Sequence, residues 1–68
     1  MTVISKVRQT VNALKGIEGT LKIYSIQERD EDAKIAFNTA LKTTHEIIED
    51  IEIRVRNIEL EEPQYKEN

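Results

Sequence analysis

Apolar residues in the first part of the chain recur at steps of three and four. This spacing places them on one face of an α-helix. Polar residues such as Lys6, Gln9 and Lys15 fall outside that face. The apolar series consists of Val3, Val7, Val11, Leu14, Ile17, Leu21 and Tyr24. The pattern predicts an amphipathic helix over about residues 3–28.

Gly16 and Gly19 are the weak point of this first helix. Each glycine costs about 1 kcal/mol relative to alanine in a helix interior. Both fall outside the apolar face, which favours a continuous helix. A kink or a break at this point remains the alternative.

The second half of the chain carries a more regular pattern. Asp30 can accept hydrogen bonds from the first free N–H groups of a helix, and Pro63 cannot continue one. Between them, steps of four and three run without a lapse, as in a helix that lies along another helix. That series is Phe37, Leu41, Thr44, Ile48, Ile51, Val55 and Ile58. It predicts a helix over about residues 31–61, followed by a C-terminal tail at 63–68.

Two long helices joined by so short a connection must lie antiparallel. We therefore predict an all-α fold in which residues 1–62 form one helical hairpin. The apolar face of the second helix also includes Ala33, Ala36, Ala40 and Ile47, and it then covers roughly 140°, wider than a two-helix contact needs. The excess predicts self-association into a four-helix bundle, with a homodimer favoured. A tetramer, or a complex with another helical protein, would use the same surface.

The residues predicted to form the core and the oligomer interface are the regularly spaced apolar ones of both helices. They are Val7, Val11, Leu14, Ile17, Leu21, Phe37, Leu41, Ile48, Ile51, Val55 and Ile58.

The composition narrows the remaining possibilities. A chain of 68 residues buries little apolar surface alone, and such domains depend on disulfides, a metal or a partner. The chain has no cysteine and a single histidine, which excludes disulfides, thiolate metal sites and a multi-histidine site within one chain. The net charge of −3 argues against non-specific nucleic-acid binding. The first half is basic and the second half acidic, so the two halves attract each other.

The N-terminus has no apolar run of signal-peptide length, and no stretch approaches the roughly 20 apolar residues of a membrane span. From the sequence we therefore expect a soluble, cytoplasmic protein without a membrane span.

Candidate chemistry is sparse. His45, Glu49 and Glu52 share a helical stripe that could be read as a metal site, but a zinc-protease helix needs a second histidine where Glu49 stands. A solvated acidic face is the favoured interpretation. No spacing suggests a nucleophile with its base, and no glycine-rich phosphate loop is present. We therefore predict no enzymatic activity, no metal and no cofactor.

Two further features are candidate contact sites for another protein. Ile23, Ile35, Ile53 and Leu60 point away from the apolar faces and could together form a second docking surface, although single exposed apolar residues are normal. The tail residues Pro63, Gln64, Tyr65 and Lys66 could form a linear recognition motif or only end the helix.

Several short segments resemble one family over nearly the whole chain. They are Thr2-Val3 with Ser5 and Val7, Gln9-Thr10, Leu14-Lys15-Gly16, Ala33-Lys34 with Phe37, Arg54-Val55, Ile58-Glu59 and the ending Glu61-Glu62-Pro63-Gln64-Tyr65-Lys66. The chain in these segments resembles the short proteins of domain-of-unknown-function family 1657, and the ending is the most specific part. The Ile17-Glu18-Gly19 run departs from the alanine-rich stretch typical of that place.

This resemblance implies a biological context, which the spacing of apolar residues cannot indicate. Members of the family occur in spore-forming bacteria, often encoded beside membrane proteins that move small molecules into and out of the developing spore. The resemblance implies no catalytic or ligand-binding residues. The prediction is thus a non-enzymatic oligomeric helical protein, structural or accessory to sporulation or germination and located in the cytoplasm or within the developing spore. The alternative is a regulatory module that docks on a spore membrane protein or another helical partner.

Overall fold

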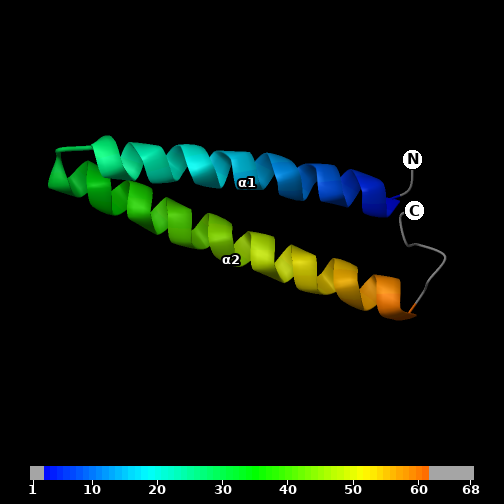
Figure 1. Ribbon diagram of the computed structural model, residues 1–68. Coiled ribbons are helices and arrows are strands. Elements are labelled where there is room, and N and C mark those ends of the chain that lie inside the picture. The colour runs from blue at the N-terminus through cyan, green and yellow to red at the C-terminus, as the bar shows by residue number, and fades with distance from the viewer. Residues whose placement is uncertain (1–2, 62–68) are drawn as a thin grey trace.

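The computed structural model describes residues 3–61, which form two antiparallel α-helices (Figure 1). α1 runs from Val3 to Gln27 and α2 from Glu31 to Glu61. A three-residue connection at 28–30 joins them at one end of the molecule. The prediction of an all-helical chain with two helices packed against each other is confirmed.

α1 continues through both of its glycines. It is one helix from Val3 to Gln27, and neither Gly16 nor Gly19 has a positive φ, so neither glycine interrupts it. The Thr20 hydroxyl donates a hydrogen bond back to the carbonyl of Gly16, at 3.1 Å. The alternative of a break at this point is therefore wrong, since the neighbouring turns and the packing on α2 outweigh the low helix propensity of glycine.

The short connection is held by side-chain caps on both sides. The Ala33 N–H donates to Asp30 Oδ2 at 2.9 Å, which confirms the predicted N-cap of α2. The Glu28 carboxylate accepts from the backbone N–H groups of Arg29 and Asp30, each at 3.0 Å. The first bond satisfies a free N–H group at the start of α2, the other two satisfy N–H groups of the connection, and together they fix a tight reversal of direction.

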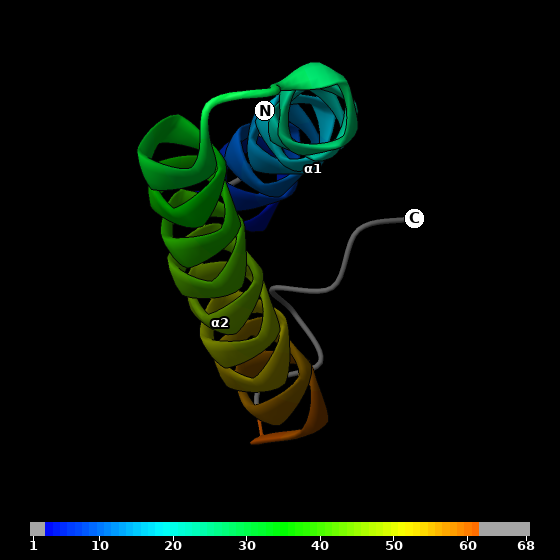
Figure 2. The same cartoon turned by 90° about the vertical axis from the view of Figure 1, so that its left-hand side faces the viewer.

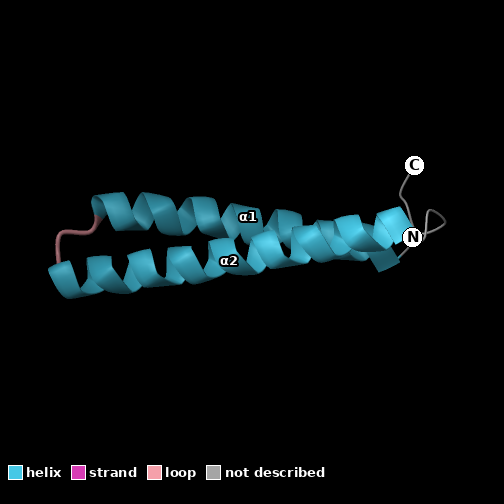
Figure 3. Ribbon diagram, turned by 90° about the horizontal axis from the view of Figure 1, so that it is seen from below, coloured by secondary structure: helices cyan, strands magenta, loops and turns pink. Residues whose placement is uncertain are grey.

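The hairpin is long and thin. Its principal extents are 49 × 18 × 12 Å, and its radius of gyration is 15.3 Å, whereas a compact chain of this length has a value of about 11 Å. Viewed towards the connection, α1 and α2 lie side by side (Figure 2), and in the view from below the loop at 28–30 joins them (Figure 3). The core is consequently a single seam between two helices.

The buried residues define that seam. Only Ile4, Val11, Ser25, Ile48 and Val55 are buried within residues 3–61, and none of their side chains falls below 2% exposure. Half-buried residues fill the gaps at steps of three and four: Val7, Leu14, Glu18 and Leu21 on α1, and Phe37, Leu41, Thr44 and Ile51 on α2. This alternation is the repeat of a two-stranded antiparallel coiled coil.

The predicted apolar face of α1 coincides only in part with the seam of the hairpin. Val3 is 74% exposed, and Ile4 takes the seam position with 3% exposure. Ile17 and Tyr24 are also about half exposed, while Glu18 and Ser25 occupy the seam beside them. The apolar series of the sequence combined two neighbouring stripes that both follow a seven-residue spacing, and in the hairpin the stripe that contains Ile4 and Val11 faces α2. On α2 the predicted series lies in the seam up to Val55, and Ile58 is 42% exposed.

Candidate interaction surface

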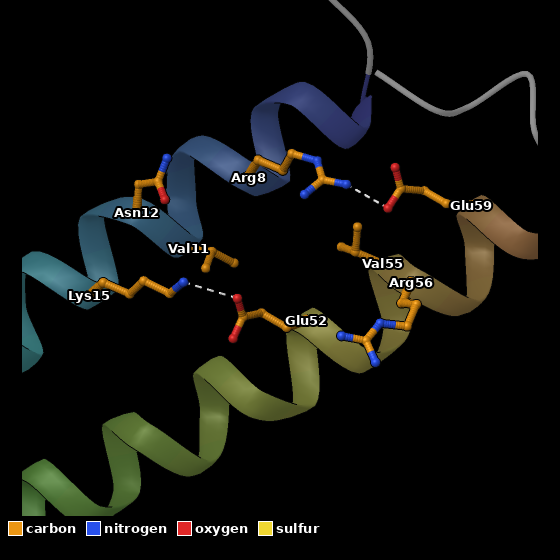
Figure 4. A pocket seen from close by; sticks show the side chains of 8 residues that line it. All are labelled: Arg8, Val11, Asn12, Lys15, Glu52, Val55, Arg56 and Glu59. Atoms are coloured by element: carbon orange, nitrogen blue, oxygen red, sulfur yellow. Dashed lines mark hydrogen bonds and ion pairs between the residues drawn. The ribbon is translucent and has the colours of Figure 1, made fainter. Parts of the chain in front are cut away.

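Ion pairs between the helices close one broad face of the hairpin. Arg8 Nη2 lies 2.5 Å from Glu59 Oε1, and Lys15 Nζ lies 3.0 Å from Glu52 Oε2 (Figure 4). Arg8 and Lys15 are seven residues apart, as are Glu52 and Glu59, so each set follows one line along its helix. We call this side the charged face.

A shallow groove runs along the charged face between the two ion pairs. Figure 4 shows Val11 and Val55 between the helices, with the paired charges reaching across beside them. The groove has a volume of about 290 Å³ and is also lined by Asn12 and Arg56. Small-molecule sites are deeper and mostly apolar, so this groove has the character of a solvated helix boundary.

His45 lies between two carboxylates further along the same face. Its Nδ1 is 2.7 Å from Glu18 Oε2 on α1, and its Nε2 is 2.7 Å from Glu49 Oε1 on its own helix. The hydrogen bond with Glu18 raises the pKa of His45 above 6.5, and the negative charges of Glu18 and Glu49 act in the same direction. An imidazolium can donate from both nitrogens at once, so this arrangement suits the protonated ring.

The geometry around His45 does not gather ligands for a metal. The two carboxylates lie on opposite ring nitrogens, so they cannot join one nitrogen in binding the same ion. Glu52, the third member of the predicted stripe, pairs with Lys15. Within residues 3–61 no group of three ligating side chains has the geometry to hold a metal ion. Spacing alone missed Glu18, which lies 27 residues before His45.

A polar pair interrupts the seam near the connection. The buried Ser25 hydroxyl donates a hydrogen bond to Asn38 Oδ1 on α2, at 2.5 Å. A hydroxyl at a buried position needs such a partner, so the pair favours one register of the two helices. The only signal in the sequence was the seven-residue spacing of Ser25 from Glu18 and Val11, which an apolar series cannot reveal.

The opposite broad face is free of charge over more than half its length. Ile17 follows Lys15 by two residues and Ile47 follows His45 by two, which rotates each roughly 200° around its helix, away from the charged face. Ile17 is 50% exposed and Ile47 is 45% exposed. We call this side the uncharged face and define it by Ala13, Ile17, Thr20, Tyr24 and Gln27 of α1 with Ala33, Ala36, Ala40, Thr43 and Ile47 of α2.

The other candidate contact residues are scattered. Ile23, Ile35, Ile53 and Leu60 are all exposed, and they lie along the outer edges of both helices. Ile26 is similarly exposed at 73% and did not feature in the sequence prediction. The possible recognition motif at Pro63, Gln64, Tyr65 and Lys66 lies outside the described residues.

Comparison with known proteins identifies a family. The model of a family described as "Protein of unknown function (DUF1657)" matches residues 7–55, which is 49 of the 68 residues. The chain belongs to the DUF1657 family. No curated protein and no solved structure matches the chain.

The DUF1657 match covers most of the hairpin. It includes the connection, the seam from Val7 to Val55, and every residue of the uncharged face. The family description names no activity and no ligand. Within the described part of this DUF1657 chain, neither helix is apolar enough over a sufficient length to cross a membrane.

Proposed function

We propose that this protein is a non-enzymatic helical assembly protein that works as a homodimer, with two hairpins forming a four-helix bundle. The observation that supports this proposal most strongly is the apolar surface that stays exposed to solvent after the two helices have packed. Ile17, Tyr24 and Ile47 are each between 45% and 50% exposed and share one face. Contiguous exposed apolar surface is typical of an interface.

The charge division between the helices supports the same arrangement. α1 carries four basic residues and one acidic residue, a net charge of +3. α2 carries four basic and eight acidic residues, a net charge of −4 with His45 neutral. In a bundle of two hairpins with like helices placed diagonally, each α1 neighbours two α2 helices. The net positive helix of one hairpin then lies beside the net negative helix of the other, and helices of like net charge are kept apart.

We propose a non-enzymatic role because the polar side chains of the charged face form ion pairs with one another. On the charged face, Arg8, Lys15 and His45 each lie within ion-pair distance of a carboxylate, so these groups stabilise the hairpin. The face offers a shallow groove between them. An accessory role in sporulation or germination, in the cytoplasm or the developing spore, follows from the family resemblance and belongs to the same proposal.

The dependence of thermal unfolding on protein concentration tests this proposal. When folding is coupled to dimer formation, the midpoint temperature rises with protomer concentration, whereas the midpoint of a folded monomer stays constant. We expect the midpoint, followed by circular dichroism, to rise over a hundredfold range of concentration. A constant midpoint in a fully helical sample would contradict the proposal.

Ile51→Lys provides a second test. Ile51 is half-buried in the seam, and a lysine there places a charge at the helix boundary. The variant should become a monomer or an unfolded chain. A variant that stays oligomeric and fully helical would show that this seam does not support the assembly.

A further inference from the structure

The two broad faces of the hairpin differ sharply in their chemistry. Lys15 and Glu52 join the helices across the charged face. At the same level on the other side lie Ile17 and Ile47, each about half exposed. The remainder of that side carries charge at Lys6, Asp50, Arg54 and Glu61, all towards the end away from the connection.

We propose that the uncharged face is the surface through which a second copy of the chain binds, so that two hairpins stack face to face. The inference rests on the proposed homodimer, and it goes further by assigning the interface to one of two broad faces. The charged face then stays in contact with solvent.

The size of this side suits a partner of the same length. α1 is 25 residues long, which gives about 37 Å at 1.5 Å per residue. The hairpin is 18 Å across, so this broad side as a whole, with its charged end beyond the uncharged face included, has a projected area of about 650 Å². A stable interface buries about 800 Å² from each partner. Only a partner that covers the full length of the side approaches that area, and a second hairpin does so.

Charge also favours a second copy on this side. Each chain has a net charge of −3, so two copies associate best where their surfaces carry least charge. Of the charges on this side, Asp50 and Arg54 neutralise each other, with Arg54 Nε 3.1 Å from Asp50 Oδ2. Stacking through the other side would instead remove the paired charges of the charged face from water, which is costly.

An aromatic pair provides an anchor near the connection. The rings of Tyr24 and Phe37 contact each other with centroids 5.8 Å apart and planes inclined by 55°. Phe37 is half-buried and holds the Tyr24 ring, which is still 49% exposed. Aromatic side chains held in this way are enriched in the cores of protein–protein interfaces.

Two matched pairs of isoleucines allow the uncharged face to be compared with the outer edges of the helices. Ile17 and Ile23 lie on α1 with exposures of 50% and 54%, and Ile47 and Ile53 lie on α2 with 45% and 55%. Within each pair, the first residue belongs to the uncharged face and the second lies on the outer edge of the same helix. The experiment compares the dimer dissociation constants of four single variants, Ile17→Lys, Ile47→Lys, Ile23→Lys and Ile53→Lys, by sedimentation equilibrium.

The expected result is a clear division between the pairs. Ile17→Lys and Ile47→Lys should each raise the dissociation constant by at least about 30-fold, because each places two desolvated charges in a symmetric interface. The two outer-edge variants should change it by less than about threefold. Equal effects within the pairs, or larger effects from Ile23→Lys or Ile53→Lys, would overturn the assignment while leaving the homodimer intact.

If a lysine variant unfolds, thiol labelling of cysteine variants tests the same assignment of the interface. The chain has no cysteine, so Ile17→Cys and Ile23→Cys each introduce a single thiol. At concentrations above the dissociation constant, a water-soluble thiol reagent should label the first variant more slowly than the second. Equal labelling rates in a dimeric sample would overturn the assignment. A wild-type chain that remains a folded monomer would overturn both this inference and the homodimer, and would leave the uncharged face for a different helical protein.

Discussion

Ile48→Ala should remove a large part of the stability of this protein. Ile48 is 3% exposed, and it lies in the seam with half-buried Thr44 and Ile51 before and after it. The substitution deletes three carbon groups, each worth about 0.8 kcal/mol when buried. Alanine has the higher helix propensity, which returns a few tenths of a kcal/mol. Because the seam borders solvent, neighbouring side chains can relax into the space, so the cavity adds little.

The net expectation is a loss of about 2 kcal/mol per chain. A chain of this length has a free energy of unfolding on the order of 3–10 kcal/mol, so the loss is a substantial fraction of the total. In urea, where small proteins lose about 1 kcal/mol per molar denaturant, the midpoint should fall by about 2 M. Helicity followed by circular dichroism at one fixed protomer concentration measures this shift, since the stability of a dimer depends on concentration.

Ile53→Ala is the matched control for this prediction. It makes the same chemical change on the same helix, five residues further on, at a side chain that is 55% exposed. Its effect should lie within about 0.5 kcal/mol of zero. If Ile53→Ala destabilised the protein as much as Ile48→Ala, the assignment of the seam on α2 would be refuted.

Three further predictions follow from the local geometry. The raised pKa of His45 contributes stability that is fully present below pH 6.5 and is lost as the pH rises through the raised value, so the wild type should melt at a higher temperature at pH 6 than at pH 8. His45→Gln should reduce that difference, and an unchanged difference would contradict the role of this contact. Gly16→Ala and Gly19→Ala should each stabilise the protein by about 1 kcal/mol in urea unfolding, because an added Cβ meets nothing within 4 Å at either position, and a destabilised variant would contradict that reasoning. A double-mutant cycle on Arg8 and Glu59 should give a coupling below about 1 kcal/mol that falls with added salt, and a larger, salt-insensitive coupling would mean that the pair is shielded from solvent.

The sequence was sufficient to predict the hairpin because each signal agreed with the others. Periodic apolar residues, a capping Asp30 and a connection too short for any other topology all required two antiparallel helices. The seam on α2 was also predictable up to Val55, because its apolar residues follow the seven-residue repeat and few others compete with them.

On α1 the same reasoning was less accurate, because two apolar stripes lie side by side. Val3, Ile17 and Tyr24 form one stripe and Ile4, Val11 and Leu14 lie on the other, and periodicity alone does not decide which of them meets α2. In the structure, hydrogen bonds to α2 show which stripe of α1 lies in the seam. Glu18 reaches His45, and Ser25 reaches Asn38.

The sequence indicated that an interaction surface exists, but it did not indicate on which broad face of the hairpin that surface lies. The width of the apolar face on α2 indicated an interface, and Ile47 belonged to that reasoning. The division into a charged and an uncharged face depends on how the lysine and arginine positions of α1 align with the carboxylates of α2. That alignment is set by the register of the two helices, which the Ser25–Asn38 hydrogen bond and the short connection fix together.

The mass of the protein in solution tests the central claim most directly. Light scattering after size-exclusion chromatography, at two well-separated loading concentrations, measures this mass without any assumption about shape. The account predicts twice the 7.9 kDa of one chain at both concentrations, in a fully helical sample. A fully helical species of 7.9 kDa at both concentrations would contradict it, because the uncharged face would then remain open without a second copy.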